Sequence, residues 1–548
     1  MILNFFVDLY LYFSSIIGTM FCSIQKDMID HVRGKLFSAT LDGCDSCSSD
    51  SISSDFSVAT FEDILYLLPE IYCFTSLVLL LGIVSVCEFQ QPKISKNLRV
   101  VQLTFYIMLM FSLILFMFYN DLGIYRDILG GFLRQVPYFT QLKMGIVFLL
   151  LLYFIYLKDY IFLNRIRSFE FVSLIAFSAV SSLILLISNH FIMIYLSIEL
   201  LSIPLYIVCT LKNKEASRSI SAGVTYFLLG GISSSLLVFG MCLIYGSTGI
   251  LNLDDLYKYL VFEDQFFIMD NGFLIFGMIL LTCGLFFKLT IVPFHSWAAR
   301  IYEDSPSGLT AYIAIFSKVI IIVLFIKLYY LIFIGGFAQG FVWIFYLFGL
   351  LSMVVGIYGA LFEPATKRFL AYSSISHMGL VICALGTNTQ MAPQAILLYI
   401  IIYSTILLGL FSIVSLDVNL RTFIVNFSQI VKVNPALGYS TLVLLFSLAG
   451  IPPLAGFWGK LFLYKTFIDN GLYLIALIIV VLSVISTFYY LRLIKIISFE
   501  RSSEMIITKL IVPKGTATVI SFCVWFNLLF IFYPDPIYAL CILLTKLI

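Results

Sequence analysis

Four ionisable side chains, Glu199, Lys288, Lys318 and Lys460, lie inside stretches that are otherwise apolar enough to cross a membrane. A lone charge there costs at least ~2.5 kcal/mol, so it is normally functional or neutralised by a partner. A buried lysine tends to lose its proton and a nearby glutamate keeps it charged, so a movable Glu–Lys pair is a two-position proton switch. The alternative is a static ion pair that joins helices. For residues inside a membrane we favour the switch.

Lys318 is the clearest of these residues because it lies near the middle of the run 306–332, with apolar residues on both sides. Lys327 lies closer to the end of the same run, where a lysine stem reaches the headgroups, and we favour that simpler interpretation for it. His295 and His377 are candidate proton relays, but a hydrogen-bonded core histidine is equally common, and both interpretations stay open.

Prolines interrupt two of these stretches. Pro293 follows Lys288 by five residues, and Pro452 and Pro453 precede Lys460. Proline removes a backbone hydrogen bond within a helix, and the freed carbonyls need polar surroundings. Two broken helices in corresponding positions predict paired structural repeats with ion sites at the breaks. For Lys460, a position at the edge of a loop just past a Gly/Pro turn is the alternative.

The elements that must position these residues follow from composition. Of the 548 residues, 61% are hydrophobic and 11% are charged, whereas soluble domains carry roughly a quarter charged residues. A soluble globule is excluded, and the chain is long enough for an all-α polytopic membrane protein. The net charge of +2 implies no nucleic-acid partner. No Lys or Arg precedes Lys26, which argues against a cleaved targeting segment.

Apolar runs of spanning length predict fourteen core transmembrane helices and one extra N-terminal helix near 2–24. The core runs are 63–87, 99–119, 139–157, 169–188, 190–211, 219–246, 272–297, 306–332, 340–361, 367–386, 392–416, 436–466, 471–497 and 516–545. A polar, Ser-rich stretch separates them from the extra helix. We therefore expect an N-terminal extension at 1–60 and a membrane domain at 61–548.

Loop cations test this helix count, because Lys and Arg stay on the side of synthesis. Eighteen follow the odd-numbered core helices: Lys93, Lys96, Arg99, Lys158, Arg165, Arg167, Lys212, Lys214, Arg218, Arg300, Lys367, Arg368, Arg421, Lys432, Lys495, Arg501, Lys509 and Lys514. Four follow the even-numbered helices: Arg126, Arg134, Lys143 and Lys258. A wrong count would scramble this parity, so the asymmetry supports fourteen helices with both ends of the core facing outward.

Redox and metal chemistry have little support in the sequence. Of eleven cysteines, only Cys44 and Cys47 form a C-x-x-C pair, and only His31 lies upstream. That falls short of a four-ligand metal signal. The chain also has no G-x-G-x-x-G motif, no phosphate loop and no Cys/His set for haem or iron–sulfur clusters. We predict that no electron transfer occurs in this chain.

Four runs carry a recognisable pattern: Ser197–Tyr206, Lys288–Trp297, Arg368–Gly379 and Gly450–Lys460. Together they resemble subunit 2 (bacterial subunit N) of respiratory NADH:ubiquinone oxidoreductase, complex I. The resemblance covers about 61–548 in order. The run 301–311 also resembles this subunit more than the sister subunits 4 and 5, although Ser307-Gly308 stands where Thr-Pro is usual and Ala299-Arg300 where Pro-Asp is usual.

For the fold, the resemblance implies two inverted five-helix repeats, at about 168–332 and 340–497, with helices 7 and 12 broken. For the site, it implies that Glu199 pairs with Lys288, that Lys318 is the central connecting lysine, and that Lys460 is the terminal proton donor or acceptor.

For function, the resemblance implies a membrane-arm subunit of complex I that translocates protons while other subunits transfer electrons from NADH to ubiquinone. Flavin, iron–sulfur clusters and ubiquinone then belong to other subunits, and this chain holds no cofactor beyond bound phospholipids. The implied partners are the sister subunit 4, the small subunits 4L and 6, and lipids.

The implied location is the mitochondrial inner membrane, with the bacterial plasma membrane as the alternative. Two other functions stay open. One is a subunit of a Mrp-type monovalent cation/proton antiporter. The other is an inert assembly scaffold whose buried charges are static pairs.

Overall fold

The computed structural model describes residues 66–90, 96–120, 126–164, 166, 168–211, 216–262, 272–333, 338–416, 434–499 and 512–545. The expected helix near 2–24, the polar stretch to residue 60 with Cys44 and Cys47, and half of the cations that follow odd-numbered helices lie outside these residues; the cations are Lys93, Arg165, Arg167, Lys212, Lys214, Arg421, Lys432, Arg501 and Lys509. The chain divides into two compact units, Met1–Tyr72 and Cys73–Ile548. The second unit contains all four of the ionisable residues expected inside the membrane.

Helices make up nearly all of the described chain. In the first half they are α3 (Leu68–Gln90), α4 (Lys96–Asn120), α5 (Pro137–Asn164), α6 (Glu170–Ile187), α7 (Phe191–Cys209), α8 (Ala216–Thr248), α9 (Leu253–Phe262), α11 (Gly272–Leu289), α12 (Ser296–Asp304), α13 (Ser307–Tyr312), the π-helix η1 (Ile313–Ser317), α14 (Lys318–Leu328) and the π-helix η2 (Tyr329–Phe333).

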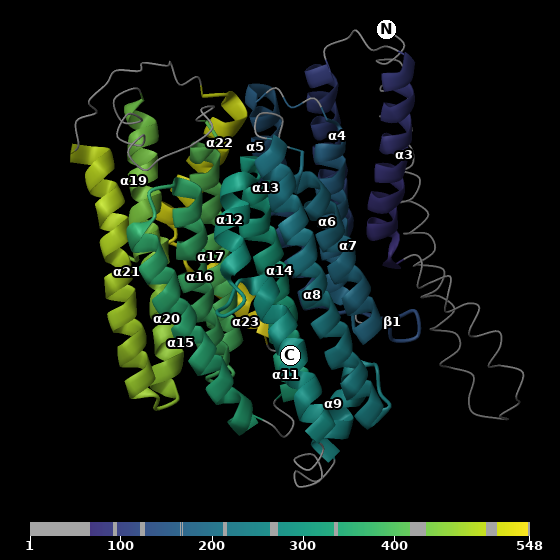
Figure 1. Ribbon diagram of the computed structural model, residues 1–548, viewed down its shortest axis with the longest axis vertical. Coiled ribbons are helices and arrows are strands. Elements are labelled where there is room, and N and C mark those ends of the chain that lie inside the picture. The colour runs from purple at the N-terminus through teal and green to yellow at the C-terminus, as the bar shows by residue number, and fades with distance from the viewer. Residues whose placement is uncertain are drawn as a thin grey trace, which may run out of the picture. The chain divides into compact units, whose positions relative to one another are not determined.

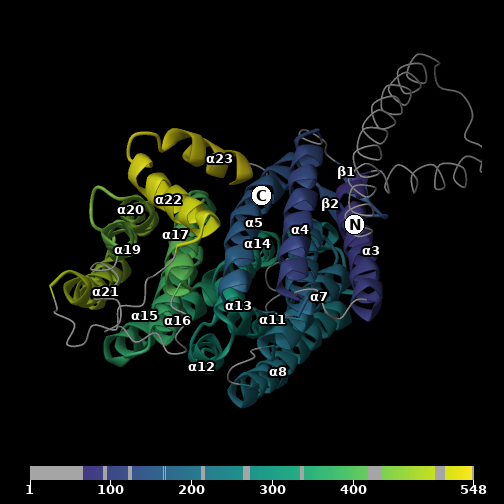
Figure 2. The same ribbon diagram turned by 90° about the horizontal axis from the view of Figure 1, so that it is seen from above.

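The second half contains α15 (Ala338–Phe362), α16 (Thr366–Leu385), α17 (Ala392–Val414), α19 (Pro435–Ala449), α20 (Ala455–Asp469), α21 (Tyr473–Phe499), α22 (Lys514–Leu529) and α23 (Asp535–Thr545). Among the residues that the structure describes, ten helices are long and apolar enough to cross a membrane. The predicted class, a helical polytopic membrane protein, is confirmed. In Figure 2, α13 and α14 lie between a group containing α7, α8 and α11 and a group containing α15 to α17 and α19 to α22.

Small residues let neighbouring helices approach closely. A Cβ atom added at Gly240 on α8 would lie 2.7 Å from the carbonyl oxygen of Gly277 on α11, and one at Gly356 on α15 would lie 2.6 Å from the amide nitrogen of Ser376 on α16. Close backbone approach at glycine is a common way to pack helices in a membrane, where dispersion contacts must replace the hydrophobic effect.

Two interruptions divide helices at the prolines noted in the sequence. After α11 the chain passes through Thr290, with φ +63°, and the cis peptide Val292–Pro293 before α12 begins. After α19 it passes through Gly450, with φ +82°, and the cis peptide Pro452–Pro453 before α20 begins. In both places a residue in the left-handed region ends the first helix and a proline prevents its continuation.

Three features differ from the sequence-based expectation. The run 516–545 is not one helix but α22 and α23, because Pro534 and Pro536 prevent an uninterrupted helix. The loop before α5 forms an antiparallel hairpin of β1 (Arg126–Ile128) and β2 (Leu133–Gln135). The run 306–332 is helical from Ser307 onward but contains two π segments.

Candidate functional site

Lys318 is the residue around which the buried polar groups gather. It lies at the start of α14, directly after η1, and is 2% exposed. Its Nζ donates to Ser374 Oγ at 2.8 Å and to Thr290 Oγ1 at 3.2 Å, and lies 5.9 Å from the centre of the Tyr302 ring. Two hydroxyls, and no carboxylate, are the hydrogen-bond partners of this amine among the described residues. The π segment directly before Lys318 is of a kind that is frequent at functional sites.

The partners of Lys318 come from three elements. Thr290 belongs to the break after α11, Tyr302 to α12, and Ser374 to α16. The left-handed backbone at Thr290 is uncommon for a residue other than glycine and recurs at functional sites. The break after α11 thus supplies a hydroxyl group to Lys318 of α14.

Lys288 lies in the last turn of α11 and is buried. Its Nζ donates to the hydroxyl of Tyr206 on α7 at 3.3 Å and lies 5.8 Å from the centre of that ring. A cation in the last turn of a helix is stabilised by the exposed carbonyl ends of the helix dipole. The end of α11 therefore provides a favourable position for a charged lysine.

No hydrogen bond joins Glu199 to Lys288 in this structure. Its Oε1 is buried and has no hydrogen-bond partner among the described residues, and no ion pair within 4.0 Å joins it to Lys288. Tyr206 lies seven residues further along α7, two turns away on the same face, and takes the place that the sequence interpretation assigned to the carboxylate. The structure thus shows Glu199 and Lys288 apart.

His377 joins α16 to two other helices. Its Nε2 lies 2.8 Å from the hydroxyl of Tyr490 on α21, and its Nδ1 lies 2.6 Å from the hydroxyl of Tyr399 on α17. Ser374, the partner of Lys318, is three residues earlier on α16 and shares its face with His377. Lys318 and Lys460 are both near enough to His377 to interact with it electrostatically. His377 is therefore a buried titratable side chain close to both lysines.

Lys460 fills the second helix break. It is buried in the second turn of α20, and its Nζ donates to the carbonyl oxygens of Leu448 and Ala449, each at 3.0 Å. These carbonyls end α19 and are free of helical partners because Gly450 and the prolines stop the helix. Lys460 is thus held inside the break, and the alternative of a lysine at the edge of a loop is wrong.

His295 stands apart from this group. It occupies the N-cap position of α12 without a side-chain cap hydrogen bond, and its Nδ1 is buried with no partner among the described residues. The indole of Trp297 closes the same break by donating to the carbonyl oxygen of Phe287 at 3.2 Å. Within the part of the chain that the structure describes, no hydrogen bond joins His295 to Lys288 or Lys318.

Sequence reasoning missed the hydroxyl partners of the buried lysines and of His377. They are Thr290, Ser374, Tyr206, Tyr399 and Tyr490. Helical spacing was the available signal for two of them, since Tyr206 is seven residues from Glu199 and Ser374 three from His377. The other three, Thr290, Tyr399 and Tyr490, belong to different elements from the residues they bind, so no spacing in the sequence indicates these pairs.

The fold and this buried row of lysines, hydroxyls and one histidine define an antiporter-like helical membrane subunit. Residues 188–486 match the family described as NADH:quinone oxidoreductase/Mrp antiporter, TM. This segment contains Glu199, Lys288, Lys318 and Lys460.

Two relatives make the assignment more specific. NADH-quinone oxidoreductase subunit N of Wolbachia sp. subsp. Brugia malayi is 37% identical over 374 residues, which cover 68% of this chain and 78% of the relative. NADH-ubiquinone oxidoreductase chain 2 of Marchantia polymorpha is 34% identical over 394 residues, which cover 70% and 80%. The chain belongs to the NADH:quinone oxidoreductase/Mrp antiporter transmembrane family and, within it, to the group of subunit N and chain 2. The resemblance inferred from the sequence is confirmed.

Solved structures share the fold. A chain of respiratory complex I from Thermus thermophilus with bound aureothin aligns with a TM-score of 0.71 at 24% identity, covering 86% of this chain and 98% of that one. A chain of the Mrp complex from Dietzia sp. aligns with a TM-score of 0.73 at 17% identity, covering 87% and 96%. The fold is therefore common to complex I and Mrp membrane subunits.

Proposed function

We propose that this chain is a core membrane-arm subunit of complex I that takes part in proton translocation coupled to electron transfer from NADH to ubiquinone. Relatives named subunit N and chain 2 support the assignment to that complex. The observation that carries the proton-transfer role is the setting of Lys318, a fully buried amine bonded to two hydroxyls. Hydroxyls accept hydrogen bonds from both the charged and the neutral amine, so this lysine can change protonation state without losing its partners.

In this proposal the catalytic residues for translocation are Glu199, Lys288, Lys318 and Lys460. Movement of Glu199 toward Lys288 would stabilise the charged form of that lysine, and its withdrawal, as in this structure, would favour the neutral form. A proton on one lysine raises the cost of a proton on the next, so the charge state passes along the row. His377 is the relay between Lys318 and Lys460, and His295 is a second candidate relay.

We also propose the finer architecture that the sequence implied. Fourteen core helices result if α11 with α12, α13 with α14, α19 with α20, and α22 with α23 each count as one interrupted helix and the ten-residue α9 is not counted as a span. The inverted repeats would extend over about 168–332 and 340–497. The two breaks at Pro293 and at Pro452 and Pro453, each with a left-handed residue before the prolines, support this pairing. The segment 1–60 would add one further helix.

The partners of the chain would be other membrane-arm subunits, among them the sister subunit 4 and the small subunits 4L and 6, together with lipids. Its location would be the mitochondrial inner membrane or, alternatively, a bacterial plasma membrane. Flavin, iron–sulfur clusters and ubiquinone would belong to other subunits. Within the described ranges no group of three or more His, Cys, Asp and Glu could hold a metal ion.

Proton translocation by the assembled complex tests this function. The Lys318→Met variant, reconstituted in liposomes, should lose proton uptake during NADH oxidation, because methionine keeps the volume of the side chain but carries no proton. Lys465→Met is the matched control, since Lys465 is exposed on α20. Unchanged proton uptake per NADH in Lys318→Met would refute the proposal and favour the scaffold.

The Mrp-type alternative has one observation in its favour, the shared fold with the Mrp complex chain. It predicts exchange of Na⁺ or K⁺ for protons in liposomes without any NADH. Co-purification of the chain with NADH dehydrogenase activity, and no exchange in the absence of NADH, would exclude it.

A further inference from the structure

A second lysine of α14, Lys327, is as deeply buried as Lys318. It is 5% exposed, so the sequence-based expectation that it reaches the headgroups is wrong. It lies nine residues after Lys318, which places it about 14 Å further along the helix. Its Nζ donates to the carbonyl oxygen of Ser188 at 2.6 Å and lies 4.9 Å from the centre of the Phe139 ring.

The short segment 188–190 between α6 and α7 covers Lys327. It is held from both sides, because the amide of Asn189 donates to Phe132 O at 2.9 Å and its carbonyl accepts from the amide of Leu253 at 3.0 Å. The ring of His190 stacks on that of Phe132 with centroids 4.3 Å apart. We call this segment the strap.

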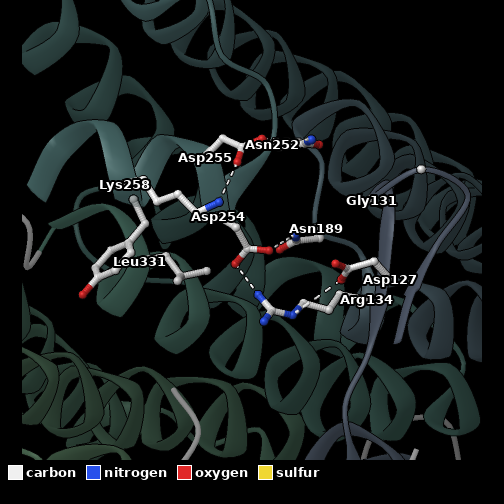
Figure 3. Close-up of a pocket in the computed structure, with 11 residues that line it drawn as sticks. Asp127, Gly131, Arg134, Asn189, Asn252, Asp254, Asp255, Lys258 and Leu331 are labelled. Carbon is white, nitrogen blue, oxygen red and sulfur yellow. Dashed lines mark hydrogen bonds and ion pairs between the residues drawn. The ribbon is translucent and has the colours of Figure 1, made fainter. Parts of the chain in front are cut away.

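A polar pocket of about 670 Å³ lies on the strap (Figure 3). Its charged and amide side chains include Asp127, Arg134, Asn189, Asp254, Asp255 and Lys258. Figure 3 shows Arg134 directed at Asp254 and Asp127, with which it forms ion pairs. Asn189 Nδ2 donates to Asp254 Oδ2 at 2.6 Å. One residue of the strap thus binds a pocket carboxylate while its neighbour, Ser188, binds Lys327.

The pocket and the lysine also share the end of the helix that carries Lys327. Leu331 in η2 lines the pocket and lies four residues, about one helical turn, after Lys327. The charged groups that act on Lys327 are Asp254 at the start of α9 and Arg134 on β2. The other elements packed against it present an aromatic ring, Phe139 from α5, and a backbone carbonyl.

The loops that form the pocket belong to the face with few cations. They contain three of the four Lys and Arg that follow even-numbered helices, so the charge asymmetry places this end away from the side of synthesis. Figure 1 shows β1 and α9 at the same end of the bundle. The pocket would then open on the side to which protons are delivered.

We infer that Lys327 and the Asp254 pocket form an outward proton-transfer site of the first repeat, a step that rests on the proposed function. In this step the ammonium of Lys327 releases a proton and becomes a neutral amine. The carboxylate of Asp254, reached through water, accepts the proton and passes it to the pocket. A proton from the direction of Lys318 then restores the ammonium. The backbone acceptor at Ser188 suits this cycle, because a carbonyl binds an amine in either charge state, whereas a carboxylate would hold the lysine charged.

One substitution distinguishes a proton-transfer role of Lys327 from a purely structural role. Lys327→Arg keeps a positive charge and a donor for the Ser188 carbonyl, but a guanidinium group does not release its proton at physiological pH. In the liposome-reconstituted complex we expect Lys327→Arg and Lys327→Met to lose proton uptake while the amount of assembled complex stays normal in Lys327→Arg. Lys495→Met, on the exposed side of α21, is the control for loss of a lysine.

Comparison with Lys318→Met separates the two proposals. Normal uptake in Lys327→Arg together with lost uptake in Lys318→Met would overturn the outward site and leave the proposed function intact. Normal uptake in both variants would overturn the proposed function as well. If neither Lys327 variant assembles, Asp254→Asn decides, since it keeps the size of the acceptor and removes its ability to take a proton; normal uptake in Asp254→Asn would overturn the outward site.

Discussion

Replacing Ser374 with alanine removes one of the two hydroxyl acceptors of the Lys318 ammonium group, the one at 2.8 Å. A hydrogen bond to a charged group contributes about 1.5 to 3 kcal/mol and one between neutral groups about 0.5 to 1.5 kcal/mol. The substitution therefore disfavours the protonated lysine relative to the neutral one by the difference, about 1 to 1.5 kcal/mol. At a pH where most Lys318 side chains are neutral, the protonated fraction therefore falls about tenfold.

The pH dependence of proton uptake in the reconstituted complex measures this effect. About a tenfold higher proton concentration is needed to restore the same protonated fraction of Lys318. The curve of proton uptake against pH for Ser374→Ala should therefore shift toward acid by about one pH unit. Ser412→Ala on α17 is the matched control, because the Ser412 hydroxyl is also buried and donates to a carbonyl of its own helix. Superimposable profiles for Ser374→Ala and the wild type would refute the role of this hydroxyl, as would an equal shift in Ser412→Ala.

The remaining predictions concern other parts of the same region. Tyr206→Phe removes the hydroxyl that accepts a hydrogen bond from Lys288. The charged lysine loses about 1.5 to 3 kcal/mol of stabilisation, so the rate of proton uptake should fall about tenfold or more. An unchanged rate would contradict this prediction. Gly450→Ala places a Cβ in the left-handed region and 2.9 Å from Lys460 Cδ, so the free energy of unfolding should fall by about 1 to 2 kcal/mol, measurable as a lower midpoint of thermal unfolding. Burial, with Asp254 and Asp255 nearby, raises the pKa of Asp127. The carboxyl group of Asp127 therefore binds its proton more tightly in the folded hairpin than in the unfolded chain. This stabilises the folded hairpin at low pH, and the stabilisation is lost as the pH rises through the raised pKa. Amide exchange of residues 126–135 should slow as pH falls, after correction for intrinsic rates, and Asp127→Asn should remove the dependence.

Much of the fold is readable from local composition. Ten described helices, each on a predicted apolar run, are long and apolar enough to cross a membrane, because the length of a spanning segment follows from the thickness of the bilayer. The positions of the two breaks follow from prolines for a similarly local reason. The hairpin before α5 and the π segment before Lys318 were not foreseen, since short strands and single-turn π segments depend on packing and leave weak sequence signals.

Gly308 illustrates how packing explains an unexpected residue. The sequence departs from the usual Thr-Pro at Ser307-Gly308, and nothing in the local pattern explains the change. In the structure a Cβ at Gly308 would lie 2.9 Å from Leu157 Cδ1 and 3.0 Å from the Tyr160 ring, while the Gly308 carbonyl accepts from the Tyr153 hydroxyl at 2.8 Å. Glycine thus allows α13 to approach α5.

By itself the sequence determined the helical membrane class and the family, and it singled out three of the buried lysines, Lys288, Lys318 and Lys460, but not Lys327. A charged residue is costly to bury within an apolar run, and such a residue can be recognised from the sequence of the run alone. Only the tertiary structure decided the partners. Lys288 binds Tyr206 and not Glu199, Lys318 binds Thr290 and Ser374, and Lys327 lies under the strap. Hydrogen bonds form only within about 3.5 Å, and the residues that meet these lysines come from segments tens of positions away in the chain.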